Sequence, residues 1–90
     1  MRVILLGGGE TVETIYFLAR LFVRRRYEVT IVNPDPAEAQ MLSRRTKATV
    51  LLGDGSDPTV LEEAGARQAD LLLSLTPQDP DNLVACQVAQ

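Results

Sequence analysis

The residues best suited to bind a ligand form a glycine-rich run near the N-terminus, Gly7-Gly8-Gly9-Glu10-Thr11-Val12. The run lies between a predicted strand and a predicted helix, and it matches the pattern G-x-G-x-x-G except at its last position. In that pattern the first glycine allows a tight turn. The second lets a phosphate approach the free N–H groups at the positive end of the helix. We therefore expect a phosphate-binding loop; the alternative is a glycine-rich turn that holds no ligand.

The position that usually binds the ribose of a nucleotide carries an amide instead of an acid. Dinucleotide sites place Asp or Glu at the end of the second strand, whereas here Val32 is followed by Asn33. The carbonyl of Asn33 can accept a hydroxyl hydrogen bond, but the missing charge lowers affinity about five- to tenfold. Asp35 is an alternative acid, although it also suits a helix N-cap. NADP is disfavoured, because Pro34 and Asp35 stand where an Arg would bind the 2′-phosphate.

Two further loops are predicted to face the same site. Asp54, in Gly53-Asp54-Gly55-Ser56, follows the third strand and can accept a hydrogen bond from an adenine amino group. An ordinary Asp-Gly turn is an equally good interpretation of that loop. Thr76 follows the fourth strand, where it would touch the second ribose of a dinucleotide. Val12 replaces the third glycine, and we expect it to displace or strain the first helix at a cost of about 1–3 kcal/mol.

The composition of the 90 residues excludes other kinds of chemistry. There is no His, which removes His-based catalytic triads and His-ligated zinc sites, and the single Cys86 cannot form an internal disulfide. A lone cysteine favours a reducing compartment. The net charge of −3 argues against a general binder of nucleic acids or anionic membranes. No apolar run approaches the ~20 residues that a membrane-spanning helix requires.

Alternating strand and helix patterns must position these loops. Near-continuous apolar runs are typical of parallel strands covered on both faces, and they predict strands near 2–6, 28–32, 48–52 and 69–75. Helices are predicted between and after them, near 10–25, 36–46, 58–64 and 80–90. Short alternating elements imply right-handed crossovers, hence an α/β, Rossmann-like doubly wound parallel sheet of about four strands in the order 3-2-1-4. Ligands of such sheets bind beyond the carboxyl ends of the strands.

Three Asp-Pro pairs mark helix starts, at 35–36, 57–58 and 79–80. Asp is a preferred N-cap, and Pro at the next position has no N–H group to leave unpaired. Glu38, three residues after Asp35, fits a capping box. Gly65 suits the left-handed position after the third helix. The regular spacing predicts a repeated β-α unit and carries no chemistry.

Several longer stretches point to a family. They are Val3-Ile4-Leu5-Leu6-Gly7-Gly8-Gly9, Ile31-Val32-Asn33, Gly53-Asp54-Gly55-Ser56-Asp57, Val60-Leu61-Glu62-Glu63-Ala64-Gly65-Ala66, Ala69-Asp70 and Asn82-Leu83-Val84-Ala85-Cys86. Together they closely resemble the N-terminal domain of Trk-type potassium-uptake regulators, the RCK or TrkA-N family. The resemblance covers essentially all 90 residues. It departs from the family at Val12 and Asn33, both in the ligand site, which implies weakened or altered nucleotide binding.

The resemblance implies a regulatory, non-enzymatic domain of a potassium channel or transporter that binds NAD(H) or an adenine nucleotide such as ATP or ADP. It implies a cytoplasmic domain held at the inner face of the membrane through a transporter subunit, a homodimer or larger ring, and no nucleic-acid partner. The expected cofactor-binding residues are Gly7, Gly8, Gly9, Glu10, Thr11, Asn33, Pro34, Asp54, Gly55 and Thr76. No catalytic residue and no metal ligand is expected.

Two other functions stay open: the NAD-binding half of an oxidoreductase, and a ligand-free Rossmann module that serves assembly. The family domain continues past its fourth helix, and four strands would leave strand 4 with an open edge, which buried sheets avoid. We therefore expect residues 1–90 to be one TrkA-N-like domain within a longer chain, or to have that edge covered by another chain. Apolar side chains surround nearly the whole of the first helix, which also suggests contact with a partner or with further parts of the chain.

Overall fold

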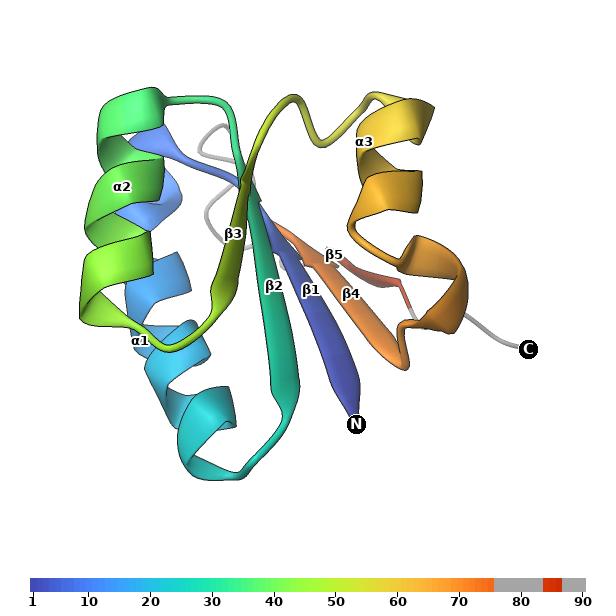
Figure 1. Cartoon of the computed structure of the whole chain (residues 1–90), viewed down its shortest axis with the longest axis horizontal. Coiled ribbons are helices and arrows are strands. Elements are labelled where there is room, and N and C mark those ends of the chain that lie inside the picture. Colours follow the sequence, from blue (N-terminus) through green and yellow to red (C-terminus); the bar gives the residue numbers. More distant parts are fainter. Residues whose placement is uncertain (76–83, 87–90) are drawn as a thin grey trace.

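The computed structural model describes residues 1–75 and the strand 84–86 (Figure 1). The chain alternates strands with helices as predicted. In order, its elements are β1 (Arg2–Leu6), the 3₁₀ turn η1 (Gly9–Thr11), α1 (Val12–Arg24), β2 (Glu28–Asn33), α2 (Pro36–Arg45), β3 (Thr49–Leu52), α3 (Pro58–Glu63), the 3₁₀ turn η2 (Ala66–Gln68), β4 (Leu71–Ser74) and β5 (Val84–Cys86).

The sheet has the order β3-β2-β1-β4-β5. β1 lies between β2 and β4, and both pairings are parallel, as is the pairing of β2 with β3. The predicted order of the four parallel strands, 3-2-1-4, is therefore confirmed. Figure 1 shows α1 and α2 on one face of the sheet and α3 on the other, the two-sided covering of a Rossmann-like fold.

Alternate residues of β1 face the two helical layers. Val3 and Leu5 pack with Ile15 of α1 and Leu42 of α2, whereas Ile4 and Leu6 pack in a smaller cluster with Val60 and Leu61 of α3. Successive side chains of a strand point to opposite faces. Because both faces are covered, every position from Val3 to Leu6 is buried, which explains why β1 is apolar without alternation.

Asp35 and Asp57 cap α2 and α3 as predicted. Oδ1 of Asp35 accepts hydrogen bonds from the N–H groups of Ala37 at 2.8 Å and Glu38 at 3.3 Å. Oδ1 of Asp57 accepts from the N–H of Thr59 at 2.9 Å. Asp35 is thus engaged as an N-cap, the second of the two roles considered for it. The Asp79-Pro80 pair lies outside the described residues.

Only half of the predicted capping box forms at the start of α2: the Glu38 N–H donates to Asp35 Oδ1, but the Asp35 N–H has a different acceptor. In a capping box the side chain of Glu38 would accept from the N–H of Asp35. That N–H instead donates to Oδ1 of Asn33 at 2.7 Å, and Glu38 is bound elsewhere. The prediction for Gly65 is confirmed: it follows α3 with a φ of 86° in the left-handed region.

The predicted helix over 80–90 is wrong where the structure describes that segment. Residues 84–86 form β5, which pairs antiparallel with β4 in the register Leu72↔Cys86, Leu73↔Ala85 and Ser74↔Val84. The pairing satisfies N–H and C=O groups along the edge of β4 that the four-strand expectation left open. Pairing with the open edge of β4 thus stabilises a strand where the local pattern favours a helix. The chain itself covers part of the edge that we expected a longer chain or another chain to cover.

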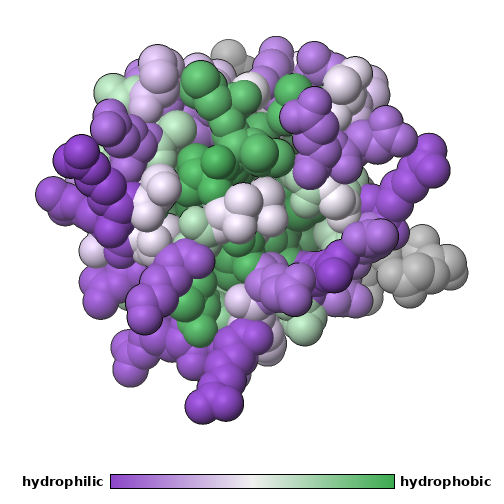
Figure 2. Space-filling model, viewed as in Figure 1, coloured by the Kyte–Doolittle hydropathy of each residue, from purple (hydrophilic) through white to green (hydrophobic). Residues whose placement is uncertain are grey.

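On the opposite border of the sheet, no strand of the described part of the chain pairs with the outer edge of β3. Leu52 on β3 is 58% exposed. Figure 2, viewed as in Figure 1, shows hydrophobic side chains gathered in the middle of the face where β3 lies nearest, with hydrophilic groups around them. In the described part of the chain, none of the helices combines the length and apolar character needed to cross a membrane.

Candidate functional site

A pocket of about 360 Å³ lies beyond the carboxyl ends of the parallel strands. We call it the strand-end pocket; it is lined by Leu6, Gly7, Gly8, Val32, Pro34, Asp54, Gly55, Ser56, Ser74 and Leu75. Its walls come from the loops after β1, β2 and β3 and from the end of β4. Five predicted site residues, Gly7, Gly8, Pro34, Asp54 and Gly55, meet there although up to 48 positions separate them, because parallel strands carry all their following loops to the same edge.

The glycine loop turns sharply from β1 into α1. Gly7 has a φ of +150° and Gly9 a φ of +62°, both of which disfavour a side chain. A Cβ on Gly7 would lie 2.9 Å from Ile15 Cδ1 and from Thr11 Oγ1, whereas a Cβ on Gly9 would meet nothing within 4 Å. The first glycine therefore allows the tight approach of strand to helix, whereas a side chain at position 9 would have open space around its Cβ.

Glu38 of α2 occupies the N–H of Gly9. Its Oε1 and Oε2 lie 2.9 and 3.2 Å from Gly9 N, and Oε1 also accepts from Nδ2 of Asn33 at 3.1 Å. A carboxylate is thus bound by the loop that we expect to bind anions, next to the start of η1 and α1. Glu38 was not among the predicted site residues. The sequence contained one signal for it: Glu38 is an acidic residue in the first turn of α2, and the strand before it ends in Asn33 instead of the usual acid.

Asn33 lies at the end of β2 as predicted, but its side chain is completely buried. Its carbonyl, which we expected to face a ribose, accepts the Asp35 N–H, and its amide group faces Glu38. Gly8 explains how these groups fit. Its backbone is extended, with a φ of 178°, yet a Cβ there would lie 2.9 Å from Glu38 Oε1 and 3.0 Å from Asn33 Nδ2. Close approach, rather than backbone conformation, requires glycine at this position.

Asp54 forms the Asp-Gly turn that was one of its two interpretations. Its Oδ1 accepts from Ser56 N at 2.9 Å and from Ser56 Oγ at 2.8 Å. The Ser56 backbone N–H, followed by the Ser56 hydroxyl, lowers the pKa of the Asp54 carboxyl below its usual range. Asp54 is exposed and therefore stays an ionised hydrogen-bond acceptor at the rim of the strand-end pocket, so the turn and the adenine role are compatible.

The other predicted site residues lie apart from the pocket wall or outside the described residues. Glu10 and Thr11 belong to η1, and the Thr11 hydroxyl donates to Gly8 O at 3.0 Å. Val12 begins α1 and packs, partly buried, against the core. Thr76 lies outside the described residues. The remaining residues of the pocket wall were not predicted as site residues: Leu6, Val32, Ser56, Ser74 and Leu75.

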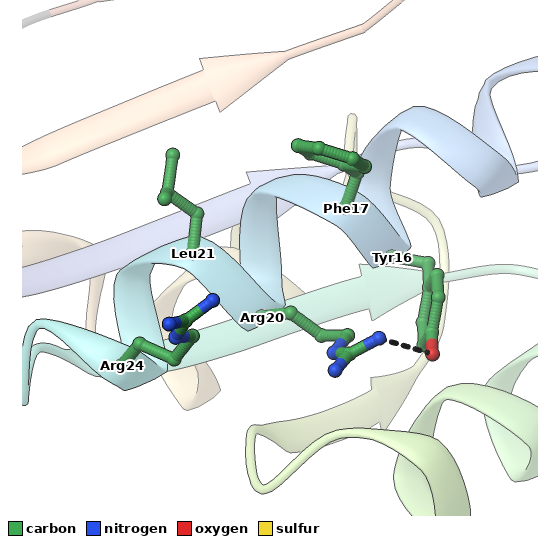
Figure 3. A pocket seen from close by; sticks show the side chains of 5 residues that line it. All are labelled: Tyr16, Phe17, Arg20, Leu21 and Arg24. Atoms are coloured by element: carbon green, nitrogen blue, oxygen red, sulfur yellow. Dashed lines mark hydrogen bonds between the residues drawn. The ribbon is translucent and has the colours of Figure 1, made fainter.

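A second pocket, of about 200 Å³, lies on α1 and is lined by Tyr16, Phe17, Arg20, Leu21 and Arg24. We call it the α1 pocket. Figure 3 shows the Arg20 guanidinium beside the Tyr16 ring; its Cζ atom lies 5.5 Å from the ring centroid, and Nη1 donates to the Tyr16 hydroxyl at 3.1 Å. Phe17 is 70% and Leu21 is 41% exposed. An exposed Phe beside Leu is typical of a contact surface.

Within the described part of the chain, no three His, Cys, Asp or Glu side chains lie together as a metal site. The carboxylates of Asp35 and Asp57 cap helices, and that of Asp54 closes a turn. The strand-end pocket is lined by the polar residues Asp54, Ser56 and Ser74 beside the glycine loop, which suits binding of a polar ligand.

Comparison with known proteins places the sequence in a family. A family model described as the TrkA-N domain matches residues 3–90. The chain belongs to the TrkA-N domain family. It is similar to Trk system potassium uptake protein TrkA of Halomonas elongata, with 37% identity over 89 residues that make up 99% of this chain and 19% of that protein.

The protein of the same name from Haemophilus influenzae is 36% identical over 88 residues, which cover 98% of this chain and 19% of that protein. A Trk system potassium uptake protein TrkA homolog of Pyrococcus abyssi is 31% identical over 90 residues, all of this chain and 38% of that protein. This TrkA-N chain thus spans about a fifth to two fifths of the length of these curated relatives.

Proposed function

We propose that this TrkA-N chain is a regulatory nucleotide-binding domain of a potassium-uptake system, without catalytic activity, and that it binds NAD(H) or an adenine nucleotide such as ATP or ADP. One observation carries the proposal. The N–H of Gly9, in the turn that leads into α1, already binds a carboxylate, and this anion-binding turn adjoins the strand-end pocket. Its 360 Å³ falls within the range of about 300–1,000 Å³ that is common for small-molecule sites.

The ligand would span the pocket from the Asp54 loop to the glycine loop. Asp54, an exposed acceptor, suits the adenine amino group. Pro34 and Val32, at the end of β2, line the pocket and would lie beside the ribose. The phosphates would face the turn from Gly7 to Thr11 beside the Gly9 N–H that Glu38 holds, where the helix dipole favours negative charge. Thr76 would contact the second ribose of a dinucleotide.

The potassium-uptake role is inferred from the relatives, whose names refer to Trk system potassium uptake. By that inference the partner is a membrane subunit of the transporter, and the domain acts in the cytoplasm at the inner face of the membrane. An oxidoreductase would need a proton-transfer group beside the nicotinamide. The sequence contains no His, and the Asp carboxylates that line or flank the pocket are engaged in caps and a turn.

We also propose that two copies of this chain associate through α1. Glu13, Phe17, Arg20 and Arg24 are all exposed and share one face, because residues three and four apart are neighbours on a helix. The face is acidic at its start and basic at its end, with Phe17 between. An antiparallel second copy would bring Glu13 against Arg24 at both ends and Phe17 against Arg20 at the centre, a self-complementary two-fold contact.

Calorimetric titration of residues 1–90 with NADH, NAD, ATP and ADP tests nucleotide binding. We expect at least one of them to bind with a Kd below about 1 mM, which corresponds to about −4 kcal/mol. Gly9→Asp places a negative charge in the loop, where nothing lies within 4 Å of the new Cβ, and should weaken binding about tenfold or more. Gly9→Asn is the matched control, because Asn also tolerates positive φ but adds no charge.

Wild-type chain that binds none of the four nucleotides below about 1 mM would refute the proposal. Equal losses in Gly9→Asp and Gly9→Asn would place the phosphates away from the glycine loop. Both variants should unfold at similar temperatures, which separates the effect of charge from that of folding.

A further inference from the structure

β2 ends in Asn33 instead of an acid, but the carboxylate of Glu38, in the first turn of α2, is hydrogen-bonded to this residue. Asn33 is buried, and its side chain bridges two groups: Oδ1 accepts from Asp35 N at 2.7 Å, and Nδ2 donates to Glu38 Oε1 at 3.1 Å. Only this orientation of the amide satisfies both neighbours, since a backbone N–H is a donor and a carboxylate is an acceptor. The network therefore fixes the amide, and the amide in turn directs the carboxylate of Glu38 toward the glycine loop.

The Glu38 carboxylate lies between the glycine loop and the end of β2, and it contacts Gly9 N and Asn33 at once. It also lies next to the wall of the strand-end pocket without being part of it: Gly8 lines that pocket, and a Cβ on Gly8 would come within 2.9 Å of Oε1. No side chain at position 8 separates the carboxylate from the pocket.

Glu38 retains hydrogen-bonding capacity for a ligand. An ionised carboxylate has about four lone-pair sites. Oε1 accepts from Gly9 N and from Asn33, whereas Oε2 has a single partner in the described residues, Gly9 N at 3.2 Å. The residue is only partly buried, so Oε2 keeps the capacity to accept a further hydrogen bond.

We propose that Glu38 is the carboxylate that binds the ribose hydroxyls of the nucleotide, and that Asn33 is a positioning residue that holds it. This inference rests on the proposed nucleotide-binding function and sharpens it. The acid absent from the end of β2 is replaced by one from the first turn of α2, five residues later in the chain. Asn33 consequently strengthens the site through Glu38 instead of weakening it as an isolated amide would.

The test compares ADP with 2′-deoxy-ADP, which lacks one ribose hydroxyl; ADP is the part that NAD and ATP share. Wild type should bind ADP about five- to tenfold more tightly than 2′-deoxy-ADP, the ratio expected for one charge-assisted hydrogen bond. Glu38→Gln keeps the size of the side chain and an acceptor for Gly9 N. It should weaken ADP about five- to tenfold and 2′-deoxy-ADP less than twofold, so that the ratio falls toward one.

Two further variants make the result specific. Glu63→Gln removes the same charge from an exposed position on α3 and should leave both affinities and their ratio unchanged. Asn33→Asp in the Glu38→Gln background returns an acid to the end of β2 and should restore the preference for ADP. A purely structural role of Glu38 would not give this pattern, because it does not depend on the ribose hydroxyl and would leave the ratio of ADP to 2′-deoxy-ADP affinity unchanged in every variant.

The outcomes separate this inference from the proposed function. Tighter binding of both ligands by Glu38→Gln would overturn it, because Glu38 would then be an internal competitor of the phosphates. An unchanged ratio in Glu38→Gln, with ADP still bound by wild type, would overturn it and leave the proposed function intact. If wild type binds neither ligand, nor any of the four nucleotides tested above, both fall together.

Discussion

Gly7 and Gly9 both have positive φ angles, but a side chain would meet different surroundings at the two positions. Gly7 is enclosed by Ile15, Thr11 and the carbonyl of Leu75, and Gly9 is open. Substitutions at the two positions therefore differ: at Gly9 a side chain adds backbone strain alone, whereas at Gly7 it adds strain and a steric clash. Gly8, between them, is required by the approach of Glu38 and Asn33. Glycine is thus favoured at these three consecutive positions for three different reasons.

We expect Gly7→Ala to destabilise the domain by at least about 2 kcal/mol, because strain at the positive φ adds to crowding in the core. Gly9→Ala should cost only about 1–2 kcal/mol, the penalty of a left-handed conformation alone. Urea unfolding followed by circular dichroism measures both free energies. Equal losses in the two variants would show that the contacts of Gly7 do not matter.

At the scale of the element, α1 ends in a Schellman motif built without glycine. The N–H of Tyr27 donates to Phe22 O at 3.1 Å and that of Arg26 to Val23 O at 2.9 Å, and the rings of Phe22 and Tyr27 stack with centroids 5.8 Å apart. Arg26 takes the left-handed position, with a φ of 64°. The bonds and the ring contact are those the motif requires, so the strain at Arg26 is offset by them.

Replacing Arg26 by glycine should relieve that strain and stabilise the domain by about 0.5–1 kcal/mol. A gain of this size would raise Tm by several degrees in a domain of this length. Arg26→Ala removes the same charge and keeps the strain, so it should not raise Tm. Differential scanning calorimetry decides between them; an equal rise in both variants would assign the effect to charge.

At the scale of the whole molecule, the sheet is covered on both faces and at the β4 edge, while α1 keeps an exposed face. The α1 pocket lies on the outward side of the helix, with Phe17 and Leu21 beside two arginines (Figure 3). Two copies paired through this face would bury the exposed phenyl ring and match opposite charges. The proposed association thus uses a surface separate from the strand-end pocket, and nucleotide binding and assembly can be tested independently.

Sedimentation equilibrium should reveal a dimer of the wild-type chain. Glu13→Arg would place two like charges together at each end of the helix pair and weaken the dimer about tenfold or more. The double variant Glu13→Arg with Arg24→Glu should recover it, because the pairing is restored with reversed sign. A wild type that stays monomeric over a wide concentration range, or a double variant no better than the single one, would contradict pairing through α1.

Much of the fold was predictable from sequence because its signals are local. The apolar runs of β1 to β4, the Asp35-Pro36 and Asp57-Pro58 helix starts and Gly65 each depend on neighbouring residues. The strand order 3-2-1-4 followed from the alternation of elements and the handedness of crossovers. These rules also placed Gly7, Gly8, Pro34, Asp54 and Gly55 at one edge, where the strand-end pocket lies.

Tertiary structure decided the features that depend on segments distant in the chain. The amino-acid sequence alone determined the strands, the caps and the glycine turn. Whether residues 84–86 formed helix or strand depended on the unpaired edge of β4. The partner of Glu38 depended on a glycine loop 29 residues away, which offered its N–H to the carboxylate in place of the local Asp35 N–H. A local pattern states what a side chain can bind, and only the packed fold determines which partner lies within reach.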